Sequence, residues 1–379
     1  MKKERIIIFM SLLLFIAGCN SSEETASSES SEENADTEQA DSEEEEVKSD
    51  IENETDVDEE EDPSSSGSNT SAYLLSIKLN SLYANGEYEE ALELIEEGLL
   101  EHPEEAVLYN DKGYILVELG RLDEGIEALE KAIELDETLE SAHSNLAYAL
   151  IDLSEYEEAM DAAQIAIDLN PDAPEQYVAM GNALTMLERD EEALSYFEDA
   201  LEIDPQADFA LYGMGASLLF LDETEESIVY LEEFLKQHPE DVDALDMLVY
   251  AYELLEDYEE ALNYADEVLE VDDEMHIIYN LDYKGILLTK DGQLDEAEEL
   301  YEEMLEEHPL DKGIAYYGLA FIDIERGEIE EGLDHLEEAM DEDPSLIDYA
   351  VTDPMFEDVL ENERFIELVE SYEDSFNEL

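Results

Sequence analysis

The sequence predicts an all-α fold, a solenoid of about eight helical pairs over residues 72–346 that is closed by a helical cap over residues 347–379. Small residues recur at a fixed spacing, they lie in segments with helical apolar periodicity, and prolines end the units at a constant offset. A chain of 379 residues fits one such array, because repeats extend a fold beyond the usual size of a single core.

The second helix of each unit carries the most regular signal. Steps of 34 residues, followed by steps of 36 and 35, separate the small residues Ala91, Gly125, Ala159, Ala193, Ser227, Ala261, Ala297 and Gly332. Around them, as in residues 88–92 and 156–160, apolar residues recur at three and four positions. This periodicity predicts an amphipathic helix.

The first helix of each unit is marked by small residues twelve positions earlier, namely Gly113, Ala147, Gly181, Gly215, Gly285 and Ala320. Small side chains at matched points let two helix backbones approach closely, while neighbouring leucines fill the space around the contact. Six units end in a proline twelve residues after the second-helix small residue: Pro103, Pro171, Pro205, Pro239, Pro309 and Pro344. Proline stops one helix and opens the next turn.

This spacing resembles the tetratricopeptide repeat (TPR), which implies a right-handed superhelical solenoid. The repeats are expected at residues 72–105, 106–139, 140–173, 174–207, 208–241, 242–275, 278–311 and 313–346. The sequence departs from the family pattern at Leu79 and Val249, where a small residue is expected, and at Glu137 and Asp273, where proline is expected. The extra residues at 274–277 predict a break between the sixth and seventh repeats. The segment after Pro344 resembles the closing segment of many bacterial tetratricopeptide proteins and is expected to cap the last core.

The N-terminus has the pattern of a secretion signal. Lys2, Lys3 and Arg5 precede an apolar run over residues 6–17, and small residues lead to Cys19. A dozen or so apolar residues fall short of the roughly 20 that a membrane-spanning helix needs. The segment resembles a bacterial lipoprotein signal, which implies removal of residues 1–18, lipidation of Cys19, and an anchored protein on the outer face of the bacterial cell membrane. Cys19 is the only cysteine, so the chain can form no internal disulfide.

Residues 19–71 are expected to form a disordered tether behind the lipid. After Cys19 they are rich in Glu, Asp, Ser and Thr, with Lys48 as the one basic residue and no aromatic residue. Such a segment cannot bury enough apolar surface to fold. The tether would therefore hold the repeats away from the membrane.

The charge of the chain excludes one class of partner and leaves two explanations open. The chain carries 112 acidic and 15 basic residues, a formal net charge of -97. Phosphate backbones repel such a surface, so nucleic acid is excluded as a partner. The acidity resembles that of secreted halophilic proteins, and the alternative is that it recruits a basic partner or cations. The ordered loop spacing of a calcium-binding EF-hand is missing, and we expect no specific metal site.

The family resemblance implies that partners bind in a concave groove lined by the first helices. The residues predicted to line it are Tyr83, Asn110, Tyr114, Tyr148, Asn182, Phe209, Tyr212, Tyr250, Tyr279, Tyr317 and Phe321, with Asp243, Asp246 and Asp282 among them. Tyrosine offers flat area at low entropic cost, and aspartate attracts cations. Because no lysine or arginine occupies these positions, we expect apolar or basic protein segments rather than acidic ones. The alternative for any one aromatic residue is packing against a neighbouring helix.

No pattern of catalytic residues appears, so an enzyme is not expected and no cofactor is implied. His102, His238 and His308 each precede a proline at the same repeat position, where a helix end favours them. The sequence has no metalloprotease motif, nucleophile turn or glycine-rich phosphate loop. We therefore expect a membrane-anchored, extracytoplasmic scaffold or adaptor that binds other proteins. The alternatives are a glycan-binding or cell-wall-binding accessory subunit and, more remotely, an unrecognised enzyme.

Overall fold

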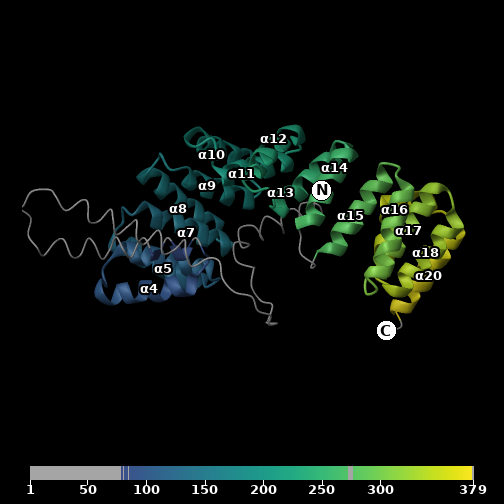
Figure 1. The fold of residues 1–379 in the computed structure, drawn as a ribbon, viewed down its shortest axis with the longest axis horizontal. Helices are drawn as coiled ribbons and strands as arrows, with labels where there is room; N and C mark the ends of the chain where they lie inside the picture. The colour runs from purple at the N-terminus through teal and green to yellow at the C-terminus, as the bar shows by residue number, and fades with distance from the viewer. Residues whose placement is uncertain (1–77, 80, 84, 272–275, 378–379) are drawn as a thin grey trace, which may run out of the picture. The chain divides into compact units, whose positions relative to one another are not determined.

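The computed structural model describes residues 78–79, 81–83, 85–271 and 276–377. Over these residues the secondary structure is helical throughout and includes no strand (Figure 1). The predicted all-α class is therefore confirmed. The predictions for the signal segment, Cys19 and the tether fall outside the described residues.

The described chain divides into two compact units, here called the N-terminal unit (up to residue 153) and the C-terminal unit (from residue 154). The N-terminal unit contains α4 (Tyr88–Glu101), α5 (Ala106–Glu118), α6 (Leu122–Leu135) and α7 (Glu140–Asp152). Each of these helices packs against the next, and α5 also packs against α7. First helices of neighbouring repeats therefore contact one another directly.

The C-terminal unit continues the alternation of first and second helices. Its helices are α8 (Tyr156–Leu169), α9 (Pro174–Met186), α10 (Asp190–Ile203), α11 (Asp208–Phe220), α12 (Thr224–Leu235), α13 (Val242–Leu254), α14 (Tyr258–Val271), α15 (Ile277–Lys290), α16 (Leu294–Glu307), α17 (Lys312–Arg326) and α18 (Ile329–Glu342). Contacts between first helices recur in the pairs α9 with α11, α11 with α13, and α15 with α17. The predicted break between the sixth and seventh repeats includes residues 272–275, which are not described.

The small residues bring the two helices of a repeat together, as their spacing predicts. A Cβ atom added to Gly113 would lie 2.5 Å from Cγ of Leu129 and 3.0 Å from the carbonyl oxygen of Gly125. A Cβ atom on Gly332 would lie 2.8 Å from the carbonyl oxygen of Ala320. Real Cβ atoms almost never lie closer than 3.0 Å to another heavy atom, so a side chain at Gly113 or Gly332 would force its neighbours to shift.

Two second helices place an aromatic ring between the glycines of two successive first helices. Phe197 of α10 occupies the space that a Cβ atom on Gly181 or Gly213 would need, at 2.5 and 2.4 Å. Tyr301 of α16 does the same for Gly285 and Gly318, at 2.4 and 2.2 Å. Both rings are fully buried. These aromatic residues therefore connect adjacent repeats as well as the helices of one repeat.

The turn between the two helices of each repeat contains one residue with positive φ, a feature that the sequence reasoning missed. Four repeats have glycine there, at Gly86, Gly120, Gly292 and Gly327, and the other four have Ser154, Glu188, Asp222 and Glu256 with φ between 57° and 64°. A left-handed backbone costs a non-glycine residue about 1 kcal/mol. Each of the middle four repeats carries this cost once, in the turn between its two helices.

The C-terminal cap consists of α19 (Leu346–Ala350), the 3-10 helix η2 (Pro354–Val359) and α20 (Glu363–Asn377). Its buried residues Phe356, Val359 and Phe365 share a core with Phe321 and Leu333 of the last repeat. The expected cap is therefore present.

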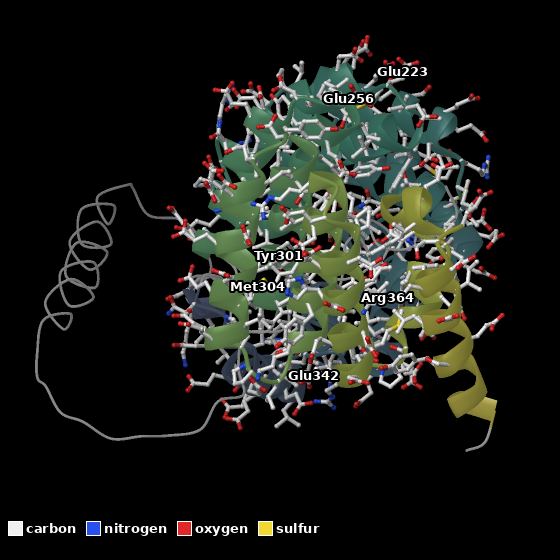
Figure 2. All side chains as sticks on the ribbon, turned by 90° about the vertical axis from the view of Figure 1, so that its right-hand side faces the viewer. Glu223, Glu256, Tyr301, Met304, Glu342 and Arg364 are labelled. Carbon is white, nitrogen blue, oxygen red and sulfur yellow. The ribbon has the colours of Figure 1, made fainter. Side chains whose placement is uncertain are left out.

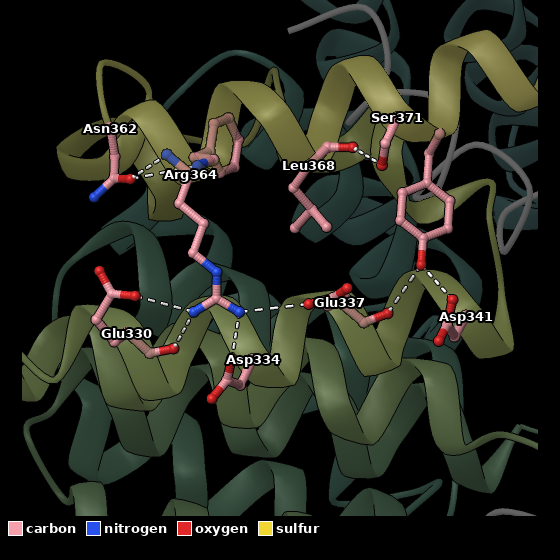
Figure 3. A network of polar contacts seen from close by, with 10 residues as sticks. Glu330, Asp334, Glu337, Asp341, Asn362, Arg364, Leu368 and Ser371 are labelled. Atoms are coloured by element: carbon pink, nitrogen blue, oxygen red, sulfur yellow. Dashed lines mark hydrogen bonds and ion pairs between the residues drawn. The ribbon is translucent and has the colours of Figure 1, made fainter.

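Arg364 of α20 adds polar contacts to this apolar cover (Figure 3). It donates to the carbonyl oxygen of Glu330 at 3.0 Å and ion-pairs with the carboxylates of Glu330, Asp334 and Glu337 on α18. One arginine thus forms ion pairs with three carboxylates where the array ends.

Candidate interaction surfaces

The eleven aromatic and asparagine residues predicted to line the groove differ widely in exposure. Phe209 and Tyr279 are the most exposed, at 48% and 50%. Tyr212, Phe321 and Asn110 are buried, at 3%, 6% and 7% exposure. The remaining six are half-buried: Tyr83, Tyr114, Tyr148, Asn182, Tyr250 and Tyr317. The predicted set is therefore not a uniform exposed surface.

The three buried residues have structural contacts of their own. Tyr212 packs edge-on against Phe234 at 5.3 Å between ring centroids, and Phe321 lies 6.5 Å from Phe356 of the cap. The side-chain oxygen of Asn110 accepts a hydrogen bond of 3.0 Å from Asn145. These residues offer little surface to a partner, which fits the packing alternative that the sequence left open.

In the C-terminal unit, tyrosines and carboxylates follow one another along the first helices. We name this set the C-terminal strip: Asp243, Asp246 and Glu253 on α13, Tyr279, Asp282 and Tyr283 on α15, Tyr317 on α17, and Asp353 before η2. The hydroxyl of Tyr283 donates to the carboxylate of Glu253, and that of Tyr317 donates to Asp353 at 3.0 Å. The rings of Tyr279 and Tyr283 lie 6.2 Å apart. Hydrogen bonds from tyrosine to carboxylate therefore join α15 to α13 and α17 to the residue before η2.

Two carboxylates of this strip, Asp243 and Asp282, lie where their charged forms are disfavoured. Burial, and then the charges of Asp241 and Asp246, raises the pKa of Asp243 to about 7, against a smaller opposing effect of His276. Burial also raises the pKa of Asp282 to about 6, although the hydrogen bond from Tyr301 lowers it. Such sites attract cations, because a positive charge relieves the repulsion.

One carboxylate of the strip already has a cation from within the chain. The ammonium group of Lys290, the last residue of α15, lies 2.5 Å from Oε1 of Glu253. The other oxygen of Glu253 accepts the hydrogen bond from Tyr283. Glu253 is thus held between a lysine and a tyrosine.

A second group of tyrosines and carboxylates lies in the N-terminal unit. We name it the N-terminal cluster: Tyr83, Tyr88, Tyr114, Glu118 and Asp152. The rings of Tyr83 and Tyr114 meet edge to face, 5.8 Å apart. The hydroxyls of Tyr88 and Tyr114 hydrogen-bond the carboxylate of Glu118. The cluster therefore combines aromatic faces with buried negative charge.

The two carboxylates of the N-terminal cluster repel each other. Burial, and then the charge of Glu118, raises the pKa of Asp152 to about 7. Burial also raises the pKa of Glu118, against the hydrogen bonds from Tyr88 and Tyr114. Within the described residues, Oδ1 of Asp152 and the hydroxyl of Tyr83 are buried without a hydrogen-bond partner. Buried polar atoms of this kind are uncommon and concentrate at functional sites.

The sequence reasoning identified Tyr83 and Tyr114 but missed Glu118 and Asp152. These carboxylates lie one position beyond those that the family resemblance assigns to the groove. A usable signal was present, because each is the last residue of its helix. The negative end of the helix dipole disfavours an acidic residue there.

The three histidines that precede prolines lie at helix ends or pack against neighbouring side chains. His102 and His308 follow the last residues of α4 and α16, as expected for helix ends. His238 lies 2.9 Å from Asp208 and stacks on Phe234 at 4.7 Å. In the part of the chain that the structure describes, no group of three or more His, Cys, Asp or Glu side chains could hold a metal ion. No described helix is long and apolar enough to cross a membrane.

Family models of the tetratricopeptide repeat match most of the array. One matches residues 113–153, a second matches 144–208 and 212–274, and a third matches 288–350. The chain contains tetratricopeptide repeats. This fold suggests a protein-interaction scaffold, and tetratricopeptide proteins are generally not enzymes. A search of curated proteins finds no match to the chain.

Several solved structures are similar to this chain at low sequence identity. The crystal structure of the APC/C hetero-tetramer Cut9–Hcn1 is 15% identical, with 79% of this chain and 57% of that chain covered and a TM-score of 0.50. YrrB, described as a TPR protein with an unusual peptide-binding site, is 22% identical over 49% of this chain and 96% of that one, with a TM-score of 0.38. PilW, described as a type IV pilus biogenesis factor, is 19% identical over 54% and 94%, with a TM-score of 0.48.

Proposed function

We propose that this protein is a membrane-anchored, extracytoplasmic scaffold that binds apolar or basic segments of other proteins on the surface of its first helices. The C-terminal strip carries this proposal, because tyrosines and carboxylates alternate over α13, α15, α17 and the cap. Tetratricopeptide repeats support a protein partner over a small-molecule substrate.

The chemistry of the strip favours a basic segment. Tyrosine rings bury apolar area and lose little side-chain entropy, and their faces attract cations. Burial is the main cause of the raised pKa values of Asp243 and Asp282, and the charges of neighbouring carboxylates add to it. Oxygen-tipped side chains also cover the surface in Figure 2, so the acidic field extends beyond the strip and would accelerate encounter with a basic partner.

Crosslinking in living cells, followed by mass spectrometry, tests the binding surface. The variant Phe209→Ser with Tyr279→Ser removes the two most exposed of the predicted groove residues without opening the core. Tyr349→Ser is the matched control, because Tyr349 is 59% exposed on the cap. We expect partner crosslinks to be lost in the double variant and retained in the control. Equal yields of the same crosslinks in both would refute the proposed surface.

The membrane anchor rests on the sequence around Cys19 and has its own test. Cys19→Ser removes the thiol that would carry the lipid. We expect this variant to leave the membrane fraction, either released into the medium or as an uncleaved precursor. Full retention of the variant in the membrane fraction would count against lipidation.

A further inference from the structure

The chain contains one filled example of a lysine held by tyrosine and carboxylate. In the C-terminal strip, Lys290 ends α15 and reaches 2.5 Å from Glu253, which also accepts the hydrogen bond from Tyr283. An ammonium group at this place meets the negative end of its own helix and a half-buried carboxylate together. The chain thereby shows which ligand suits this arrangement.

The N-terminal cluster has the same components, but within the described residues no lysine forms an ion pair with Glu118 or Asp152. Where α15 ends in Lys290, α5 ends in Glu118 and α7 ends in Asp152, and neither helix has a basic residue in its last turn. Because α5 packs against α7 and the charge of Glu118 acts on Asp152, the two carboxylates lie near each other at two negative helix ends. This arrangement is unfavourable unless a cation joins it.

Several cations of the N-terminal unit pair with other carboxylates. Lys112 lies 2.8 Å from Glu96, and Arg121 lies 2.6 Å from Glu124. Lys131 lies 2.6 Å from Glu134, three residues along the same helix. These three basic side chains are engaged elsewhere, whereas Oδ1 of Asp152 has no hydrogen-bond partner within the described residues.

We propose that the N-terminal cluster is a binding site for the ammonium group of a lysine from a partner protein. The ammonium group donates to the carboxylates of Glu118 and Asp152, and the methylene groups of the lysine pack against Tyr114 and Tyr83. Lysine has three donors and no acceptor, so it can supply a donor to Asp152, whose Oδ1 has none among the described residues, and also pair with Glu118. The faces of the aromatic rings add cation–π attraction. This inference rests on the proposed function in one respect, since a partner protein supplies the lysine.

Titration of the full chain with n-butylammonium, which is a lysine side chain without its backbone, tests the site by NMR of the tyrosine rings. We expect a saturable shift of the Tyr114 and Tyr83 signals, and no saturable shift with n-butanol. Asp152→Asn should weaken binding at least tenfold. Glu130→Gln removes one exposed carboxylate from the same unit and should leave binding unchanged. Equal responses of these two variants, or no saturable shift in the natural protein, would overturn the inference.

Two further variants separate loss of the site from loss of the fold. Asp152→Lys supplies an internal ammonium beside Glu118, so it should abolish the response to n-butylammonium while the melting temperature stays equal or rises. Lys290→Met empties the filled site and should create a second saturable response, at Tyr279 and Tyr283. An unchanged response in both variants would contradict the inference.

The outcomes also distinguish this inference from the proposed function. Partner crosslinks that are lost in the Phe209→Ser, Tyr279→Ser variant but retained in Asp152→Lys would leave the scaffold function standing and reject the lysine site. Saturable binding of n-butylammonium without any partner crosslinks in cells would support the lysine site and reject the scaffold function.

Discussion

The N-terminal cluster and the C-terminal strip place tyrosines beside carboxylates in similar ways, but they differ in what balances the carboxylates. In the C-terminal strip, Lys290 pairs with Glu253, and Tyr301 donates to Asp282 at 3.0 Å. In the N-terminal cluster, two tyrosine hydroxyls reach Glu118 but none reaches Oδ1 of Asp152 in the described residues. Burial and the charge of Glu118 raise the pKa of Asp152. Removing a polar group should therefore destabilise the chain in the C-terminal strip and stabilise it in the N-terminal cluster.

The largest effect is expected for Tyr301→Phe, which keeps the ring between Gly285 and Gly318 but removes the hydroxyl. Asp282 loses its donor in a buried place, which costs about 1–3 kcal/mol of unfolding free energy. The hydrogen bond lowers the pKa of Asp282, so its loss moves that pKa further above the present value of about 6. Because a raised carboxyl pKa means stability that is lost as pH rises, the variant should be weakened more at pH 8 than at pH 5. Urea unfolding at both values measures this, with exposed Tyr349→Phe as the control.

A smaller loss is expected for Lys290→Met, which leaves Glu253 with the hydrogen bond from Tyr283 alone. The ion pair is half-exposed, so the loss should be about 1 kcal/mol and should shrink as salt is added. Lys236→Met is the matched control, because Lys236 pairs with Glu233 on an exposed helix surface. Thermal melts at low and high salt compare the two variants. If Lys236→Met lost as much stability as Lys290→Met, the ion pair in the strip would contribute no more than an ion pair on an exposed helix surface.

The opposite effect on stability is expected for Asp152→Asn. The variant should raise the free energy of unfolding by about 0.5–1 kcal/mol at pH 8, and the gain stays small because part of the carboxylate remains in water. Burial and Glu118 raise the pKa of Asp152 to about 7 in the folded chain, from its ordinary value of 3.8. The protonated carboxyl therefore stabilises the fold below pH 4, and this contribution is lost as pH rises towards 7. Melts across this range should show the advantage of the variant appearing between these values, with Glu130→Gln as the control. If the stability advantage of the variant did not change with pH, the titration of Asp152 would not be its cause.

The repeat pattern predicted the helices well because it depends on backbone approach. Gly113 and Gly332 lie where a Cβ atom would strike the other helix, so their spacing follows the helix pairs directly. Side-chain exposure was harder to predict, because it depends on residues from elsewhere in the array. Tyr212 is covered by Phe234 of the following helix and Phe321 by the cap, contacts that no position rule contains.

The same reason explains what sequence reasoning missed at the candidate site. Glu118 and Asp152 look like two more members of an acidic surface until burial and mutual repulsion separate them from the rest. The positive φ angles at Glu188, Asp222 and Glu256 were also missed, because glycine marks that turn in the other repeats and a glutamate there gives no local signal.

Carbodiimide coupling in intact cells tests the central claim most directly, because it joins a carboxylate only to an amine in contact with it. Mass spectrometry would map which carboxylates couple to lysines of partner proteins. The lysine site predicts that Glu118 and Asp152 couple to partner lysines more strongly than do exposed residues of the same unit such as Glu104 and Glu130. In Asp152→Lys, Glu118 should couple to the introduced lysine instead and lose its coupling to partner lysines. Coupling spread evenly over exposed carboxylates, with none at Glu118 or Asp152, would contradict it.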